Sequence, residues 1–226
     1  MTAPTPRRMI IPLLFGLIGA AVLIGLGLWQ LDRLAWKEAE LADIAARIVA
    51  DPVALPLKPD PRGDRYLPVI ATGSFTGESL DVLVSRKQIG AGVRVIEVFE
   101  TGARRVLVDR GFVAQDSRDA PRGDDAATVT GNLHWPDEVD SFTPTPDATS
   151  GLWFARDVAA MAAILSTEPV LIVARDPTAP GIEPMPVDTS GIPNNHLGYA
   201  VQWFGLATVW LGMTAYLLWR IRRRTV

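Results

Sequence analysis

The chain of 226 residues contains no cysteine and only two histidines, His134 and His196. The lack of cysteine excludes disulfide bonds, thiolate metal ligands and thiol redox chemistry. Two histidines far apart in the sequence also exclude a histidine-rich zinc or non-haem iron centre within one chain. The motifs G-x-S-x-G, G-x-x-x-x-G-K-[ST] and H-E-x-x-H are missing too. We therefore expect a protein that is not an enzyme.

Two uncharged apolar runs of 23 residues each, 9–31 and 197–219, stand near the two ends of the chain. At about 1.5 Å per residue, each run forms a helix of about 35 Å, which exceeds a hydrocarbon core of roughly 30 Å. We predict transmembrane helices over 9–31 and 196–219. A cleaved secretory signal is the alternative for the first run, but the run is long and no small-residue cleavage site follows it.

The distribution of charge predicts the orientation of the spans. Residues 1–8 and 220–226 carry six arginines and no acidic residue, whereas all 25 acidic residues lie between the spans. Because Lys and Arg near span ends resist translocation, both tails should be cytoplasmic and residues 32–195 extracytoplasmic. An acidic domain without a basic stripe disfavours a nucleic acid as partner.

The region between the spans divides by composition. Residues 32–62 read as a helix extension and a proline-rich linker, 63–175 as an extracytoplasmic β-rich domain, and 176–195 as a proline-rich tether. Short β-branched runs separated by glycine predict an α+β domain with a mainly antiparallel β-sheet or a small barrel. One helix is expected over 152–166. The expected strands are 66–75, 80–86, 93–99, 105–113, 128–134 and 169–174.

The second span contains small residues and polar residues. Gly198, Gly205 and Gly212 recur every seven residues and form one face, which we expect to pack on the first span at Gly16, Ala20 and Gly27. A different ridge of this span holds His196, Ala200, Trp203, Ala207 and Trp210.

Polar side chains within or at the end of a membrane span are candidates for function. For His196 the alternative is a residue that binds lipid headgroups or caps the helix end. For Gln30 and Gln202 the alternative is an interhelical hydrogen bond, which contributes about 0.6 kcal/mol.

The segment Asn194-Asn-His-Leu-Gly-Tyr-Ala-Val-Gln-Trp-Phe-Gly-Leu-Ala resembles the C-terminal signature of the Surfeit locus protein 1 family. Three further stretches resemble the family in the same order along the chain. They are Gly27-Leu-Trp-Gln-Leu-Asp-Arg with Lys37, Val106-Leu-Val-Asp-Arg-Gly-Phe-Val, and Trp153 with Asp157. The resemblance extends over nearly the whole chain.

This resemblance implies an assembly factor for haem-copper cytochrome c oxidase that binds haem a and aids its insertion into the catalytic subunit. It implies the catalytic subunit, haem a biosynthesis enzymes and the lipid bilayer as partners, and the bacterial inner membrane, with a periplasmic central domain, as the location. It assigns His196 as the axial ligand of the haem iron. The alternative function is a membrane-anchored scaffold that stabilises the nascent oxidase without binding haem.

Further binding residues are expected around this ligand. We expect Tyr199 and Trp203 to line the haem face and Gln202 to lie nearby. Arg33, Lys37 and Arg110 are expected to pair with the haem propionates, since arginine binds carboxylates through two parallel hydrogen bonds. The alternative for these cations is a solvated charge or a contact with lipid phosphate. His134 is a candidate second ligand, or simply the end of a strand.

Overall fold

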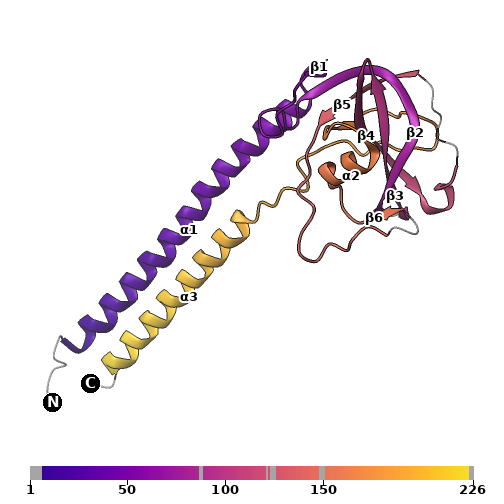
Figure 1. The fold of residues 1–226 in the computed structure, drawn as a ribbon. Coiled ribbons are helices and arrows are strands. Elements are labelled where there is room, and N and C mark those ends of the chain that lie inside the picture. Colours follow the sequence, from indigo (N-terminus) through magenta and orange to yellow (C-terminus); the bar gives the residue numbers. More distant parts are fainter. Residues whose placement is uncertain (1–6, 87–88, 121, 123–125, 148–150, 224–226) are drawn as a thin grey trace. The chain divides into compact units, whose positions relative to one another are not determined.

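The computed structural model describes residues 7–86, 89–120, 122, 126–147 and 151–223. Contacts within the chain divide it into two units, Met1–Asp43 with Ser190–Val226, and Ile44–Thr189. The first unit contains the two long helices and the second contains the sheet, as the ribbon in Figure 1 shows.

The helical unit consists of most of α1 (Arg7–Ile48) and all of α3 (His196–Arg223). Both helices are long and apolar enough to cross a membrane, and only 11% and 6% of their apolar windows are buried. Helices that leave this much apolar surface uncovered by protein are compatible with membrane anchoring. The extension of α1 beyond the apolar run ends at Ile48.

The two helices pack antiparallel, through small residues of α1 and large residues of α3. A Cβ atom added to Gly27 would lie 2.7 Å from the Phe204 ring, and one added to Gly16 would lie 2.2 Å from the Thr214 side chain. From Gly16 to Gly27 along α1 the partner on α3 moves back from Thr214 to Phe204, so the two helices run in opposite directions. The buried positions of α1 are Gly16, Ala20, Gly27 and Gln30, which repeat close to every 3.5 residues.

The prediction that Gly198, Gly205 and Gly212 form the contact face is wrong. A Cβ atom added to any of the three would meet no atom within 4 Å. The buried residues of α3 are instead Ala200 and Ala207, on the ridge that also holds His196. The seven-residue repeat shows that the three glycines share one face of α3, but it does not show what that face contacts. Glycines on one helix are enough for close packing when the other helix supplies bulky side chains.

In its described residues, the second unit is built around a seven-stranded sheet with the helix α2 (Val158–Leu165) and the 3-10 turn η1 (Gln115–Ser117). Its strands are β1 (Val53–Ala54), β2 (Pro68–Arg86), β3 (Gly90–Thr101), β4 (Arg104–Ala114), β5 (Ala126–Leu133), β6 (Leu152–Trp153) and β7 (Leu171–Ala174). Strands β2, β3 and β4 pair antiparallel in succession. The long strand β2 also pairs with β5, so the path β2–β3–β4–β7–β5 closes on itself as a small barrel.

The sheet is mixed, which corrects the expectation of a mainly antiparallel one. Strand β7 pairs parallel with β4 and antiparallel with β5, and the short strands β1 and β6 both pair parallel with β2. The parallel pairing of β4 with β7 has a physical cause, since the long connection between them, which includes α2, returns the chain in the same direction. Such long-range pairing leaves little trace in local sequence patterns.

Two local differences from the predicted elements also have identifiable causes. The expected break near Gly77 is a bulge within one continuous strand, because Gly77 (φ 81°) absorbs the register shift between Phe75 and Ser79. The expected helix over 152–166 is shorter, since Leu152–Trp153 pairs with β2 as strand β6. Helix α2 begins after Asp157, whose carboxylate accepts a hydrogen bond from the Ala160 amide at 3.0 Å.

The sheet unit also holds the C-terminal end of α1. The carbonyl oxygen of Ile48 accepts hydrogen bonds from the Asn132 amide at 2.9 Å and from the Arg175 guanidinium at 2.5 Å. The last carbonyls of a helix have no partner within the helix, so these side chains stabilise its end. Asn132 is itself buried in β5 and also donates to the Tyr66 carbonyl at 2.9 Å.

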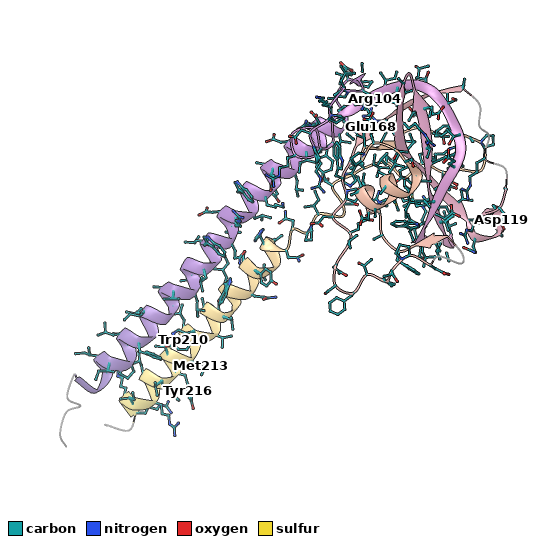
Figure 2. The ribbon with its side chains drawn as sticks, in the orientation of Figure 1. Arg104, Asp119, Glu168, Trp210, Met213 and Tyr216 are labelled. Carbon is teal, nitrogen blue, oxygen red and sulfur yellow. The ribbon has the colours of Figure 1, made fainter. Side chains whose placement is uncertain are left out.

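Several ion pairs brace the barrel, some buried and some near its surface. The guanidinium of Arg110 lies 2.6 Å from the Glu97 carboxylate, and both side chains are 1% exposed. Arg110 also donates to the Thr178 hydroxyl at 2.9 Å and stacks 4.0 Å from the centre of the Phe75 ring. Figure 2 labels a less buried pair, Arg104 and Glu168, at 2.7 Å. Removing one partner of the buried pair would leave an uncompensated charge in the interior.

A second ionic cluster lies near His134. Asp109 binds Arg94 at 2.6 Å and Arg156 at 3.1 Å, and Arg156 in turn binds Glu138. Burial, together with the positive charge of Arg156 nearby, lowers the pKa of His134 to about 4. Its ring stacks on Tyr66 with 5.5 Å between centroids, and its Nδ1 has no hydrogen-bond partner among the described residues. His134 is therefore a neutral core residue in the native state.

The lowered pKa of His134 predicts a loss of stability in mild acid. The unfolded chain takes up a proton near pH 6.5 while the folded chain resists it, so the native state loses free energy of unfolding as the pH falls from 6.5 towards 4. Between pH 6.5 and 5 the loss should be roughly 1.5 kcal/mol. We expect His134→Phe, which keeps the stack on Tyr66, to flatten this slope in denaturation of the full chain in detergent. An unchanged slope in the variant would contradict the account.

The packing predicts that enlarging a glycine of α1 disturbs the contact between the two helices, whereas enlarging a glycine of α3 does not. A disulfide between Gly16→Cys and Thr214→Cys should form in this cysteine-free chain, because the two Cβ positions lie 2.9 Å apart. A small outward shift of the helices brings them to the spacing of about 3.8 Å that a disulfide needs. In this background Gly27→Leu should reduce the disulfide yield, since the added side chain collides with Phe204. The matched control Gly205→Leu should leave the yield unchanged, because its side chain enters open space. Thiol alkylation and mass spectrometry measure the yield, and a larger effect of the control would refute this packing.

Candidate functional site

The most distinctive polar contact of the helical unit joins its two helices at His196. The Nδ1 atom of His196 lies 2.8 Å from the Oε1 atom of Gln30. His196 is the first residue of α3 and is half-buried, whereas Gln30 lies on the buried face of α1 and is 9% exposed. The contact therefore ties the beginning of α3 to the middle of α1.

Local sequence limits how early α3 can begin. Pro193 lies three residues before His196, and proline disfavours helical backbone in the residue before it, here Ile192. The carbonyl of Asn195 accepts the first helical hydrogen bond from the Tyr199 amide at 3.2 Å. The amides of the first turn have no partner within the helix, so the site lies at the polar end of an otherwise apolar helix.

The predicted neighbours of His196 on α3 separate into two groups. Trp203 is half-buried and lies seven residues on from His196, on the same ridge as the buried Ala200. Tyr199 is 50% exposed and Gln202 is also exposed. The structure thus places Trp203 on the ridge of His196, with Tyr199 and Gln202 on the open surface of the helix.

The predicted cations lie in different environments. The guanidinium of Arg33 stacks on Trp36 at 3.9 Å from the ring centre, and Lys37 forms an ion pair with Glu40 at 2.9 Å. Both follow Gln30 on α1 within two turns. Arg110 belongs to the sheet unit, where it is buried against Glu97 and Thr178. The expected contact of Arg110 with a haem propionate stays a prediction, and it would compete with this pairing in the barrel interior.

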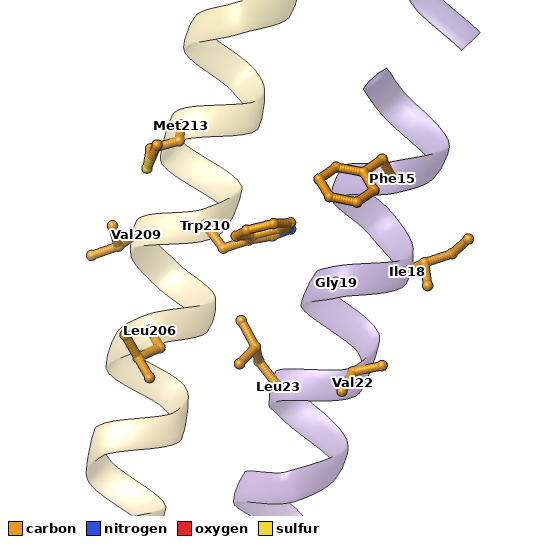
Figure 3. Close-up of a pocket in the computed structure, with 9 residues that line it drawn as sticks. All are labelled: Phe15, Ile18, Gly19, Val22, Leu23, Leu206, Val209, Trp210 and Met213. Carbon is orange, nitrogen blue, oxygen red and sulfur yellow. The ribbon is translucent and has the colours of Figure 1, made fainter. Parts of the chain in front are cut away.

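An apolar groove of about 540 Å³ runs between the two helices, away from His196. Figure 3 shows the Trp210 indole reaching from α3 towards Gly19 of α1, with Phe15 beside it. The indole nitrogen donates to the Gly16 carbonyl at 3.0 Å. A second groove of about 420 Å³ includes Arg220 in its lining, and Trp210, Met213 and Tyr216 of that groove are labelled in Figure 2.

The chemistry of the site is that of a single imidazole ligand. Across the described ranges of the chain, no residue gives a hydrogen bond to the Nε2 atom of His196. A neutral imidazole nitrogen with a free lone pair is a good axial ligand for haem iron. Within those ranges, no group of three or more His, Asp or Glu side chains is placed to hold a bare metal ion. One imidazole donor is what a haem would require from this chain, since the porphyrin supplies the other iron ligands.

The partnership of His196 with Gln30 is the feature that the sequence did not identify. The sequence indicated an interhelical hydrogen bond for Gln30 but gave no partner. The spacing of the residues on α1 could have indicated this hydrogen bond. It places the Gln30 amide on the same face as the small residues Gly16, Ala20 and Gly27.

Comparisons with known proteins cover almost the whole chain. The model of the SURF1 family matches residues 17–208. A SURF1-like protein of Monosiga brevicollis is 31% identical over 219 residues, covering 87% of this chain and 83% of the relative. Surfeit locus protein 1 of Homo sapiens is 29% identical over 220 residues, with 85% and 71% covered. The corresponding protein of Rattus norvegicus is 27% identical over 225 residues, with 88% and 72% covered.

The match of the family model includes most of α1, the whole sheet unit and the first part of α3, and it contains the segments on which the sequence resemblance was based. Because the family model spans far more than half of the chain, the assignment does not depend on any single motif. The chain belongs to the SURF1 family.

Proposed function

We propose that this protein is a membrane-anchored assembly factor for cytochrome c oxidase that carries haem a on His196 and aids its insertion into the catalytic subunit. The role in oxidase assembly follows from membership of the SURF1 family. The carrier role goes beyond family membership. It is supported chiefly by one observation, the half-buried His196 whose Nδ1 is bound to Gln30 while its Nε2 has no partner in the described part of the chain.

A single protein ligand suits a carrier better than a catalyst. One axial bond holds the iron while leaving the group able to move to an acceptor that offers a better site. When bound, haem a would supply a redox-active iron to the oxidase, and this chain only needs to hold and release it. We propose that the chain has no catalytic activity of its own.

Residues around His196 have proposed supporting roles. Trp203, on the same ridge, and Tyr199, on the open surface, offer aromatic faces to a flat apolar macrocycle. Gln202 offers an amide on that open surface. Arg33 and Lys37, close to Gln30 on α1, would pair with the propionates in place of their present contacts with Trp36 and Glu40.

The proposed location is the bacterial inner membrane, with both termini in the cytoplasm and the barrel in the periplasm. Antiparallel packing of α1 and α3 supports placing both ends of the chain on one side. The arginines at the end of α3 support the cytoplasmic side for those ends. The relatives reported above are eukaryotic, so the bacterial membrane stays a prediction. The proposed partners are the oxidase catalytic subunit, haem a biosynthesis enzymes and the lipid bilayer.

The proposal predicts the colour of the purified protein. Full-length protein from cells that also make haem a should show the visible spectrum of haem a and yield it on pigment extraction. His196→Ala should lose most of the pigment, because the axial bond is removed. The matched control is His134→Phe, which removes the other histidine of the chain and should retain the pigment.

Circular dichroism and gel filtration show whether each variant is folded. A colourless parent protein would contradict haem carriage and favour the scaffold role. Pigment that survives in His196→Ala but disappears in His134→Phe would assign the ligand to His134 and overturn the role of His196.

A further inference from the structure

The hydrogen bond at His196 fixes which ring nitrogen carries the proton. The Oε1 atom of Gln30 accepts hydrogen bonds and cannot donate them, so Nδ1 of His196 must donate across the 2.8 Å contact. In a neutral imidazole the lone pair then resides on Nε2. Without this contact the imidazole would exchange between two tautomers, of which only one offers Nε2 to a metal.

We propose that Gln30 is the positioning residue of the site, which holds His196 in its Nδ1-protonated form and presents Nε2 to the haem iron. The use of Nε2 for iron rests on the proposed function, whereas the tautomer itself does not. Metal-binding histidines commonly donate their other N–H group to a fixed acceptor, which orients the ring and raises the basicity of the ligand.

The position of Gln30 suits this role. Its side chain is 9% exposed and lies on the buried face of α1, where Gly27 lets Phe204 of α3 pack closely. The acceptor is therefore held by helix packing and does not depend on a mobile loop. Gln30 is also uncharged, so it orients the imidazole without the cost of placing a carboxylate at the level of the apolar helices.

A purely structural role is the competing explanation, in which the bond only holds the helices together. The helical unit contains a second interhelical bond, from the Trp210 indole to the Gly16 carbonyl at 3.0 Å, which has no imidazole in it. Trp210→Phe is therefore a matched control. It removes a bond between the same two helices while leaving the environment of His196 intact.

The first test needs no haem. The chain has only two histidines, so His134→Phe leaves His196 as the only imidazole in the full-length protein. In ¹⁵N-histidine-labelled protein at pH 8, nuclear magnetic resonance should show protonated Nδ1 and unprotonated Nε2. Adding Gln30→Leu should shift the ring towards the tautomer mixture of free imidazole, and Trp210→Phe should not. An Nε2-protonated ring in the parent, or no change with Gln30→Leu, would overturn the proposal.

The second test measures the affinity for haem and the properties of the bound iron. In haem-loaded protein, Gln30→Leu should weaken haem binding about tenfold, the lower end of the usual effect of losing such an acceptor. Gln30→Glu, a stronger acceptor, should raise the iron–histidine stretching frequency and lower the reduction potential. Equal spectra and affinities for parent, Gln30→Glu and Gln30→Leu would overturn the role of Gln30 while leaving haem carriage intact. A parent with the expected tautomer but no haem would overturn the proposed function and the use of Nε2 for iron, while the assignment of the tautomer to Gln30 would stand.

Discussion

The register of the two long helices is the constraint on which the candidate site depends. Apolar helices gain little from burying apolar surface against each other within lipid, so close packing and a few polar contacts must hold them. Here the glycines of α1 accept the bulky side chains of α3, with Gly27 against Phe204 and Gly16 against Thr214. The same register places Gln30 opposite His196. A shift of one residue in either helix would turn one of these side chains away from the other.

The barrel depends on a different balance of forces. Its interior contains charged side chains, above all Arg110 and Glu97, which are satisfied by each other and by neighbouring polar groups. Buried pairs of this kind contribute little net stability compared with apolar side chains of similar size, but removing one partner is costly. Asn132, near the end of β5, ties the end of α1 to the sheet, because its side-chain amide donates to the carbonyls of both Ile48 and Tyr66. The barrel thereby provides a folded anchor for the end of the long helix.

Much of this architecture could be predicted from the sequence, because the strongest signals in the chain are local. Two uncharged runs predict the two long helices, and the β-branched segments predict β3 and β4 closely. The mixed character of the sheet could not be predicted, since β7 pairs with β4 across a long connection. The burial of Arg110 could not be predicted for a similar reason, because the sequence does not show that Glu97 pairs with it in the interior. The contact face of α3 was predicted wrongly because the glycines of α3 are more regularly spaced in the sequence than those of α1. The glycines of α1 nevertheless make the contacts.

We propose that the imidazole of His196 binds haem iron. Electron nuclear double resonance on ferric, haem-loaded protein tests this directly when only histidine carries ¹⁵N and His134→Phe has removed the other ring. We expect a ¹⁵N hyperfine coupling of the size typical of an imidazole bound to the iron. Haem-loaded protein without any ¹⁵N coupling would show that the iron is held by another group and would contradict the account.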